Sequence, residues 1–258
     1  MHLNYKLIEP WLLVNKIKNF KNFKISSKSW LKAGGIVKNF ITPEKDEDCI
    51  KLIKFFKRNN LKFYVLGNIS NIIIRDGEIF TPIVNLYRLS DIYEQITSEG
   101  LNFKVRSGTS TMKFSKYITK KGITGCEGLI GIPGSIGGGV VMNTGSYGSC
   151  ISDYLKSVEC IDINGDLKIF KKNDLEFDHR KSFFQGKNFL ILNVNFYIPK
   201  KNLIGENQTN LIMEKIIDIR NNTQEKILPN LGSIFGTKNL YKDLKDKNIF
   251  FYFVYYLH

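Results

Sequence analysis

The chain has 258 residues, of which 43% are hydrophobic, and this is enough to bury the core of one large domain or of two small ones. Its net charge of +14 would favour a nucleic-acid partner if the basic residues were clustered, but all except six of the 38 are lysines and they are dispersed. No apolar run reaches the ~20 residues of a membrane span and no signal peptide begins the chain, so we expect a cytoplasmic protein. The four cysteines show no C-x-x-C spacing, which argues against a metal centre.

A helix is predicted to begin directly after Thr42. Thr42 would be its N-cap and Pro43 would hold its first position, while the apolar residues between Cys49 and Phe56 recur at helical spacing. A strand over 63–66 is expected to follow this helix, because aromatic and β-branched residues dominate there.

A polar turn follows that strand. It consists of Gly67, Asn68, Ile69, Ser70 and Asn71, and apolar β-branched residues resume after it, so we expect a second strand over 72–76. Glycine, asparagine and serine can offer donors to phosphate oxygens in such a turn, although an ordinary turn explains the same residues.

The remaining predicted elements alternate between strands and helices. They are a strand at 103–105, a helix at 111–121 ended by Gly122, a hairpin of strands 158–163 and 167–170 joined through Asn164-Gly165, a strand at 189–198, a polar linker at 199–208 and an amphipathic helix over 211–219. Mixed strand pairs and helices of this kind predict an α+β fold.

The most informative segment is the glycine-rich stretch 125–148, which holds nine of the 21 glycines. Glycine lets a backbone come close to a ligand, and consecutive N–H groups in such turns can hold a pyrophosphate. The spacing matches neither G-x-G-x-x-G nor G-x-x-x-x-G-K-[ST], so it favours another kind of phosphate cradle. A surface lid without a ligand is the alternative.

Five motifs stand in order along residues 26–236. They are Ser29–Gly35, Val65–Asn71, Gly131–Gly138 with Met142–Gly148, Phe177–Phe184 and Pro229–Phe235. Together they resemble the motifs of the UDP-N-acetylenolpyruvoylglucosamine reductase family, known as MurB. The resemblance implies a two-lobed FAD-binding domain of the PCMH/MurB type followed by a small α+β substrate lobe. We therefore expect an N-terminal extension over 1–25, the FAD-binding domain over 26–200 and a shortened substrate domain over 201–258.

The resemblance also implies a reaction. NADPH would reduce bound FAD, and reduced FAD would give a hydride to the enolpyruvyl double bond of a UDP-sugar, UDP-N-acetylglucosamine enolpyruvate, to form the peptidoglycan precursor UDP-N-acetylmuramate. Arg180 would stabilise the enolate and Ser233 would protonate it; a structural ion pair and a turn cap are the alternatives for these two residues. The residues expected to bind FAD are Gly67, Asn68, Ile69, Ser70, Asn71, Gly131, Ile132, Pro133, Gly134, Ser135, Gly137, Gly138, Asn143, Gly145, Tyr147 and Gly148.

The chain departs from the family pattern in three places. His179 stands where the family has a tyrosine, Gly236-Thr237-Lys238 replaces the family's Lys-Asn-Pro, and no glutamate follows Ser233, whereas the family's catalytic glutamate lies near the end of a longer substrate domain. Three functions therefore stay open: a working reductase, an FAD-binding protein of the same fold with lost or altered activity, and a basic module that binds nucleic acid.

Overall fold

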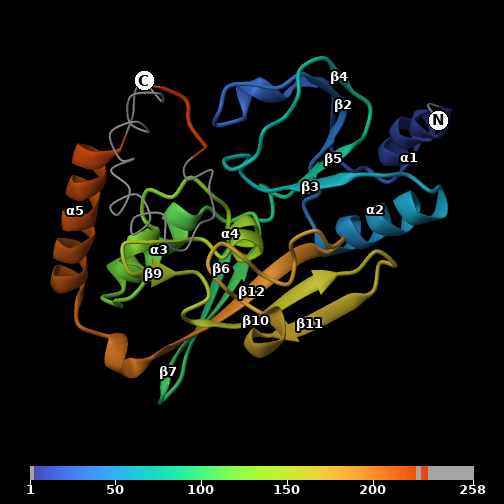
Figure 1. Ribbon diagram of the computed structural model, residues 1–258. Coiled ribbons are helices and arrows are strands. Elements are labelled where there is room, and N and C mark those ends of the chain that lie inside the picture. The colour runs from blue at the N-terminus through green and yellow to red at the C-terminus, as the bar shows by residue number, and fades with distance from the viewer. Residues whose placement is uncertain (1–2, 225–227, 232–258) are drawn as a thin grey trace.

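The computed structural model describes residues 3–224 and 228–231, and this part of the chain is an α+β fold with two five-stranded sheets (Figure 1). The first sheet is mixed and has the order β1-β2-β5-β3, with β4 paired to β2. Its strands are β1 (Asn19–Lys24), β2 (Ile36–Ile41), β3 (Tyr64–Leu66), β4 (Glu78–Ile79) and β5 (Ile83–Asn85). Helix α2 (Asp46–Arg58) is the crossover from β2 to β3, and these two strands lie parallel to β5 on either side of it.

The second sheet is antiparallel throughout, with the order β11-β10-β12-β7-β6. Its strands are β6 (Ile92–Ile96), β7 (Gly100–Arg106), β10 (Leu155–Ile161), β11 (Leu167–Lys171) and β12 (Leu190–Pro199). Val194 of the central strand β12 pairs with Val105 of β7 and with Val158 of β10, and all three are fully buried. One face of this sheet therefore forms one side of the main hydrophobic core.

The helices α3 (Thr111–Lys120) and α4 (Ile136–Met142) cover that face, and α5 (Glu206–Thr223) packs on α3 (Figure 1). Ile136 and Val140 of α4 belong to the same core cluster as Phe103 of β7 and Phe114 of α3, and each is at most 1% exposed. The other helical segments are η1 (Leu3–Leu7), α1 (Ile8–Val14), η2 (Ile25–Ser27), η3 (Glu127–Leu129), η4 (Lys172–Leu175) and η5 (Lys200–Asn202). The short hairpin β8 (Gly145–Ser146) and β9 (Ser149–Cys150) follows α4 directly.

The two sheets share a second core cluster. Leu52 and Phe56 of α2 pack there with Val84 of β5, and Leu190 and Leu192 of β12 join them. Because one cluster draws on both sheets, the sheets are fixed relative to each other by buried apolar contact.

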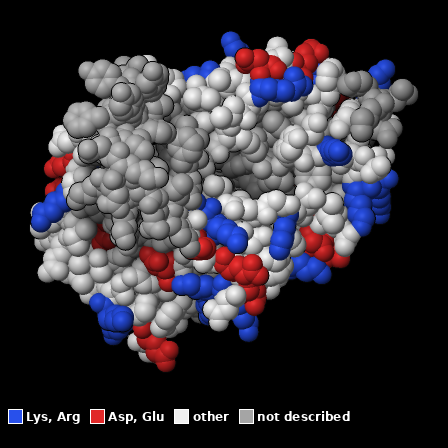
Figure 2. Space-filling view, in the orientation of Figure 1, with Lys and Arg blue, Asp and Glu red and all other residues white. Residues whose placement is uncertain are grey.

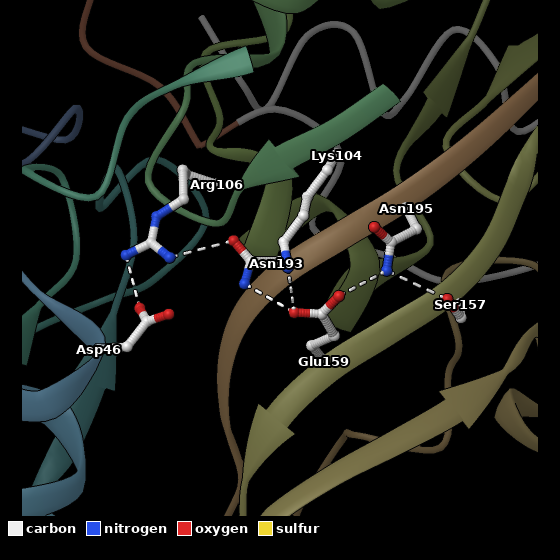
Figure 3. Close-up of polar contacts among 7 residues, drawn as sticks. All are labelled: Asp46, Lys104, Arg106, Ser157, Glu159, Asn193 and Asn195. Carbon is white, nitrogen blue, oxygen red and sulfur yellow. Dashed lines mark hydrogen bonds and ion pairs between the residues drawn. The ribbon is translucent and has the colours of Figure 1, made fainter. Parts of the chain in front are cut away.

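Polar contacts reinforce this junction on the other face of the second sheet (Figure 3). Arg106 Nη2 lies 2.6 Å from Asp46 Oδ1 at the start of α2, and Arg106 Nη1 donates to Asn193 Oδ1 at 3.1 Å. Glu159 accepts from Lys104 Nζ at 2.7 Å and from Asn193 Nδ2 at 2.9 Å. Burial alone would raise the pKa of Glu159, but the hydrogen bonds it accepts outweigh burial and hold its pKa below the ordinary value.

Most of the predicted elements are confirmed to within a few residues. The strands at 63–66, 103–105 and 189–198 are β3, β7 and β12, the helix at 111–121 is α3 with Gly122 at a φ of +73°, and the predicted hairpin is β10 and β11. The hairpin turns through Gly165 at a φ of +84°.

Three predictions about local structure are wrong. Helix α2 begins at Asp46, not after Thr42: Lys45 occupies the N-cap without a side-chain cap, and Thr42 is buried at the end of β2. Its start is stabilised instead by Asp46, Glu47 and Asp48, whose charges complement the helix dipole.

No strand forms over 72–76. The segment runs beside residues 34–36 with isolated hydrogen bonds, such as Gly35 N to Arg75 O at 3.0 Å, and Ile72 and Ile74 pack into a third core cluster. Its strand-like composition therefore reflects burial on one side and not sheet pairing.

The polar linker over 199–208 is much shorter than expected. Helical structure covers Lys200–Asn202 and resumes at Glu206, and residues 206–208 are exposed, so their polar composition reflects an exposed helix start and not a linker. The Thr209 hydroxyl donates to Thr119 O of α3 at 2.7 Å, so α5 lies against the same core as the segments before it. The expected domain boundary near 200 stays a prediction.

Candidate cofactor and active site

The polar turn after β3 has the form of an anion-binding nest. In the part of the chain that the structure describes, the backbone N–H groups of Asn68, Ile69, Ser70 and Asn71 donate to no protein acceptor. Ile69 has a φ of +52°, which is unusual for a β-branched residue. Its side chain is buried in the third core cluster and its carbonyl accepts from Trp30 N at 3.1 Å, and these contacts hold the strained backbone. Consecutive N–H groups around a left-handed residue form a concavity that suits phosphate.

The start of α4 closes this nest from the other side. A Cβ added to Gly67 would lie 2.1 Å from Ser135 Oγ, so the turn and the helix are in direct contact and only glycine fits. Asn85 Nδ2 of β5 donates to Gly67 O at 2.7 Å and holds the turn in place. The two segments that the sequence predicts to bind phosphate therefore meet in space.

Most N–H groups at the start of α4 are used within the protein. Ile136 N donates to Thr109 O and Gly137 N to Ser107 O, both at 2.8 Å, while Gly138 N lies 3.3 Å from Ser135 Oγ, which caps the helix. Phosphate donors must therefore come mainly from the turn 68–71, and α4 adds the partial positive charge of its N-terminus. The Ser107 hydroxyl, 1% exposed beside Gly137, is a further polar group without a partner among the described residues.

Two glycines near this point are not required to be glycine by a severe clash or by their backbone conformation. A Cβ on Gly134 would meet nothing closer than Thr111 Oγ1 at 3.6 Å, and a Cβ on Gly138 nothing closer than Ser135 Oγ at 3.3 Å. Neither has a positive φ. Without side chains, the backbone at these positions is accessible to a ligand.

The expected catalytic arginine lies in a tight turn at the other end of α4. Asp178 and Lys181 exchange both backbone hydrogen bonds at 3.1 Å, and Arg180 between them has a φ of +53°. Asn143 Nδ2 donates to Asp178 O at 2.8 Å and Ser182 Oγ to Val141 O at 2.8 Å, which fastens the turn to the end of α4. Within the described residues no carboxylate pairs with the half-buried Arg180. A helix of seven residues is about 10 Å long, so α4 sets the distance between the nest and Arg180.

The surface around these elements is hollowed near the centre of the face in Figure 2, where β3 and α4 approach each other in Figure 1. Basic and acidic side chains are interspersed on this face and do not gather into one basic surface. Among the described helices, none is long and apolar enough to cross a membrane.

Comparisons with known proteins identify relatives of this chain. The family described as FAD binding domain matches residues 37–171. UDP-N-acetylenolpyruvoylglucosamine reductase of Orientia tsutsugamushi (strain Ikeda) is 36% identical over 227 residues, which cover 86% of this chain and 72% of that protein. The chain belongs to the UDP-N-acetylenolpyruvoylglucosamine reductase family. The reductase of Clostridium novyi (strain NT) is 32% identical over 89% of this chain and 72% of its own length.

The fold of this reductase family is also found among solved structures. The crystal structure of MurB from Thermus caldophilus superposes with a TM-score of 0.66 over 90% of this chain and 80% of that one, at 22% identity. The predictions of the family, of the α+β class and of FAD as a cofactor are thereby confirmed. The nest at 68–71, the open space at Gly134 and Gly138, and the Ser107 hydroxyl fit the diphosphate of FAD.

Other residues that the reductase resemblance assigns to FAD make contacts within the protein. The Asn143 amide lies between Cys150 Sγ, 3.0 Å from Oδ1, and Asp178 O, so it braces the loop. Gly145, Tyr147 and Gly148 belong to the β8–β9 hairpin, whose turn has φ values of +45° and +78° at Tyr147 and Gly148. Their roles toward FAD stay predictions. Ser233 lies outside the described residues.

The sequence analysis missed two groups that shape this site. Asn85 orders the nest through Gly67, and nothing in the sequence distinguishes it from any asparagine that ends a strand. Arg220 of α5 is only 9% exposed and lies against Gly131, where an added Cβ would be 2.4 Å from Nε. Its position four residues after the buried Ile216 places it on the apolar face of the helix, and this spacing could have drawn attention to it.

A cavity of about 880 Å³ lies elsewhere, at the far end of the second sheet. Its lining includes Glu99, Asp153, Tyr154 and Lys201, and it shares no residue with the nest or with the Arg180 turn. It is therefore separate from the candidate site described above.

Proposed function

We propose that the chain reduces UDP-N-acetylglucosamine enolpyruvate to UDP-N-acetylmuramate, with FAD as bound cofactor and NADPH as reductant, in the synthesis of peptidoglycan precursors. One observation carries the proposal beyond family membership: the anion-binding nest and Arg180 are fastened to opposite ends of the same short helix. A cofactor anchored at one end by its diphosphate would thus react near the arginine at the other.

The residues of the nest would hold the diphosphate of FAD, and bound FAD would supply the two-electron chemistry that protein side chains lack. Arg180 acts on the substrate. Addition of a hydride to the enolpyruvyl group places negative charge next to its carboxylate, and a guanidinium fork both binds and stabilises such a group. Because Arg180 has no carboxylate partner among the described residues, its charge is available for this purpose. Ser233 is proposed as the proton donor for the new centre.

The fixed turn gives this arrangement its precision. Arg180 O accepts from Gln185 Nε2 at 2.8 Å, and the neighbouring Asp178 O accepts from Asn143. The backbone of Arg180 is therefore held before the substrate arrives, which lowers the reorganisation needed during the reaction.

A second candidate is an FAD-binding protein of the same fold whose reductase activity is lost or altered. It is favoured by His179 in place of the family tyrosine and by Gly236-Thr237 in place of Lys-Asn after the serine motif. His179 lies exposed in the same turn as Arg180, so this replacement falls beside the proposed chemistry.

The test is an assay of NADPH oxidation with and without the enolpyruvyl substrate. A working reductase oxidises NADPH in proportion to the substrate added, and mass spectrometry detects UDP-N-acetylmuramate. A yellow protein that oxidises NADPH at the same slow rate with and without substrate would support the second candidate. A purified protein without a flavin absorption band after incubation with FAD would contradict both.

A further inference from the structure

Arg220 is a buried cation for which the described residues provide no counter-ion. Its guanidinium donates from Nη1 to Ser146 Oγ at 3.2 Å, and its Cζ lies 5.3 Å from the centre of the Tyr147 ring. Neither contact neutralises a full charge. Burial lowers the pKa of this guanidinium from its ordinary value, as expected for a cation that is poorly compensated. A residue of this kind is rarely buried unless an anion pairs with it.

The buried carboxylate of the neighbouring element η3 does not pair with Arg220. Glu127 of η3 is 3% exposed and η3 packs against α5, yet no ion pair within 4.0 Å joins Glu127 to Arg220. Glu127 Oε2 instead accepts from Gly125 N at 2.7 Å, at the start of the glycine-rich segment. Glu127 Oε2 and the Arg220 guanidinium therefore have different hydrogen-bond partners.

The surroundings of Arg220 are those of a ligand site. It lies between Gly131, whose missing side chain leaves room for its Nε, and the β8–β9 hairpin, which supplies Ser146 and Tyr147. Both belong to the segment that the sequence assigns to the cofactor. A guanidinium carries five N–H donors in a planar fork, and among the described residues only the Ser146 and Tyr147 side chains interact with it, which leaves donors for a ligand. Such a fork is suited to phosphate oxygens.

We propose that Arg220 binds a phosphate group of a nucleotide held against residues 131–148. This assignment rests on the proposed function for the nucleotides concerned, because FAD and the UDP-sugar substrate both carry a diphosphate. The experiment is designed to tell the two sources apart.

The variants are Arg220→Gln and Arg220→Lys, with Lys215→Gln as the matched control, since Lys215 is an exposed cation on the same helix. Dissociation constants are measured for FAD by flavin fluorescence and for UDP-N-acetylglucosamine by calorimetry on the protein as purified. Arg220→Gln should weaken the binding of one of these two ligands by about 10- to 100-fold, as expected for loss of a charged hydrogen bond. Arg220→Lys should weaken the same ligand less, and Lys215→Gln should change neither. Weaker FAD binding assigns the phosphate to FAD, and weaker UDP-N-acetylglucosamine binding alone assigns it to the substrate.

Dissociation constants that stay within about twofold for both ligands, with a lower melting temperature, would show that Arg220 only fastens α5 and would overturn the proposal. If Arg220→Gln does not fold, the wild-type protein is tested by chemical modification instead. Bound FAD or UDP-N-acetylglucosamine should slow the reaction of Arg220 with phenylglyoxal, as mapped by mass spectrometry. Absence of protection by both ligands would overturn the assignment. A wild-type protein that does not bind FAD would contradict the proposed function, while the UDP-N-acetylglucosamine measurements would still test Arg220.

Discussion

Replacing Gly138 by alanine should make the protein without FAD slightly more stable and yet weaken its hold on FAD. Gly138 lies within α4 without a positive φ, so alanine gains about 1 kcal/mol in helix propensity. The new Cβ would lie 3.3 Å from Ser135 Oγ, and we expect this tight contact to cost a few tenths of a kcal/mol. The net change in the free energy of unfolding is then roughly +0.5 kcal/mol, or about 1–2 °C in melting temperature for a chain of this size.

The affinity for FAD should fall although the stability of the protein without FAD rises. If the cofactor approaches the backbone at Gly138, the added methyl group takes space that the ligand needs, and the dissociation constant should rise at least about tenfold, with Gly138→Val showing a larger effect. Thermal unfolding of the protein stripped of FAD and titration with FAD measure the two quantities separately.

Gly186→Ala is the matched control for this experiment. Gly186 has a φ of +71° in an exposed turn where an added Cβ meets nothing within 4 Å. Alanine there should lower stability by about 1 kcal/mol because of backbone strain, and should leave the affinity for FAD unchanged. A Gly138→Ala variant that binds FAD as tightly as the wild type would refute the reasoning and would favour a glycine-rich lid.

Four further outcomes are expected. Arg180→Lys should keep a normal flavin content yet slow the step that depends on the UDP-substrate on the order of tenfold more than the step that depends on NADPH, as stopped-flow absorbance can show; equal slowing of both steps would place Arg180 outside the proposed role. Ser233→Ala should lower the substrate-dependent rate by about 10² to 10⁴ while NADPH-dependent reduction is nearly unchanged, and identical traces for variant and wild type would argue for the second candidate function. The pKa of Glu159 in the folded state lies below its ordinary value of about 4.5, so ionised Glu159 stabilises the fold at pH values above 4.5, and this contribution is lost as the pH falls through the folded-state pKa. The stability advantage of the wild type over Glu159→Gln at pH 7 should therefore shrink in acid. A difference in the free energy of unfolding by urea that stays constant across pH would contradict this. FAD should be released by acid precipitation, since no histidine or cysteine motif suggests a covalent link, and a yellow washed pellet would refute this.

Features that depend on local chemistry could be predicted from the sequence. The alternation over 189–198 gave β12, and the glycines at 122 and 165 correctly marked a helix end and a hairpin turn, because these signals act within a few residues. The start of α2 could not be predicted in this way. Thr42 and Pro43 form a good capping pattern, but Thr42 is buried at the end of β2, and this tertiary placement overrides the local preference.

The candidate site shows the same difference between local features, which the sequence predicts, and long-range contacts, which it does not. The motif resemblance predicted the turn 67–71, the glycine-rich segment and the segment around Arg180 as parts of the site, since each motif is a contiguous run of residues. The contact of Gly67 with Ser135, and the bond from Asn143 to Asp178, join residues that are 35 or more positions apart. Such contacts are set by how helices pack on the second sheet, so neither the geometry of the nest nor the place of Arg220 could be derived from spacing alone.

The burial of Ile136 and Val140 beneath the cofactor segment has a consequence for how this protein can change over generations. One side of α4 is part of the main hydrophobic core, and the truncation of either residue would cost about 2–5 kcal/mol, a large fraction of the stability of an ordinary domain. A replacement of Arg180, in a half-exposed turn, carries no such penalty. A lineage that ceased to need the reaction would therefore lose Arg180 long before it lost Ile136 and Val140, so the persistence of these two residues reports on the fold, whereas the side chain at position 180 reports on selection for catalysis.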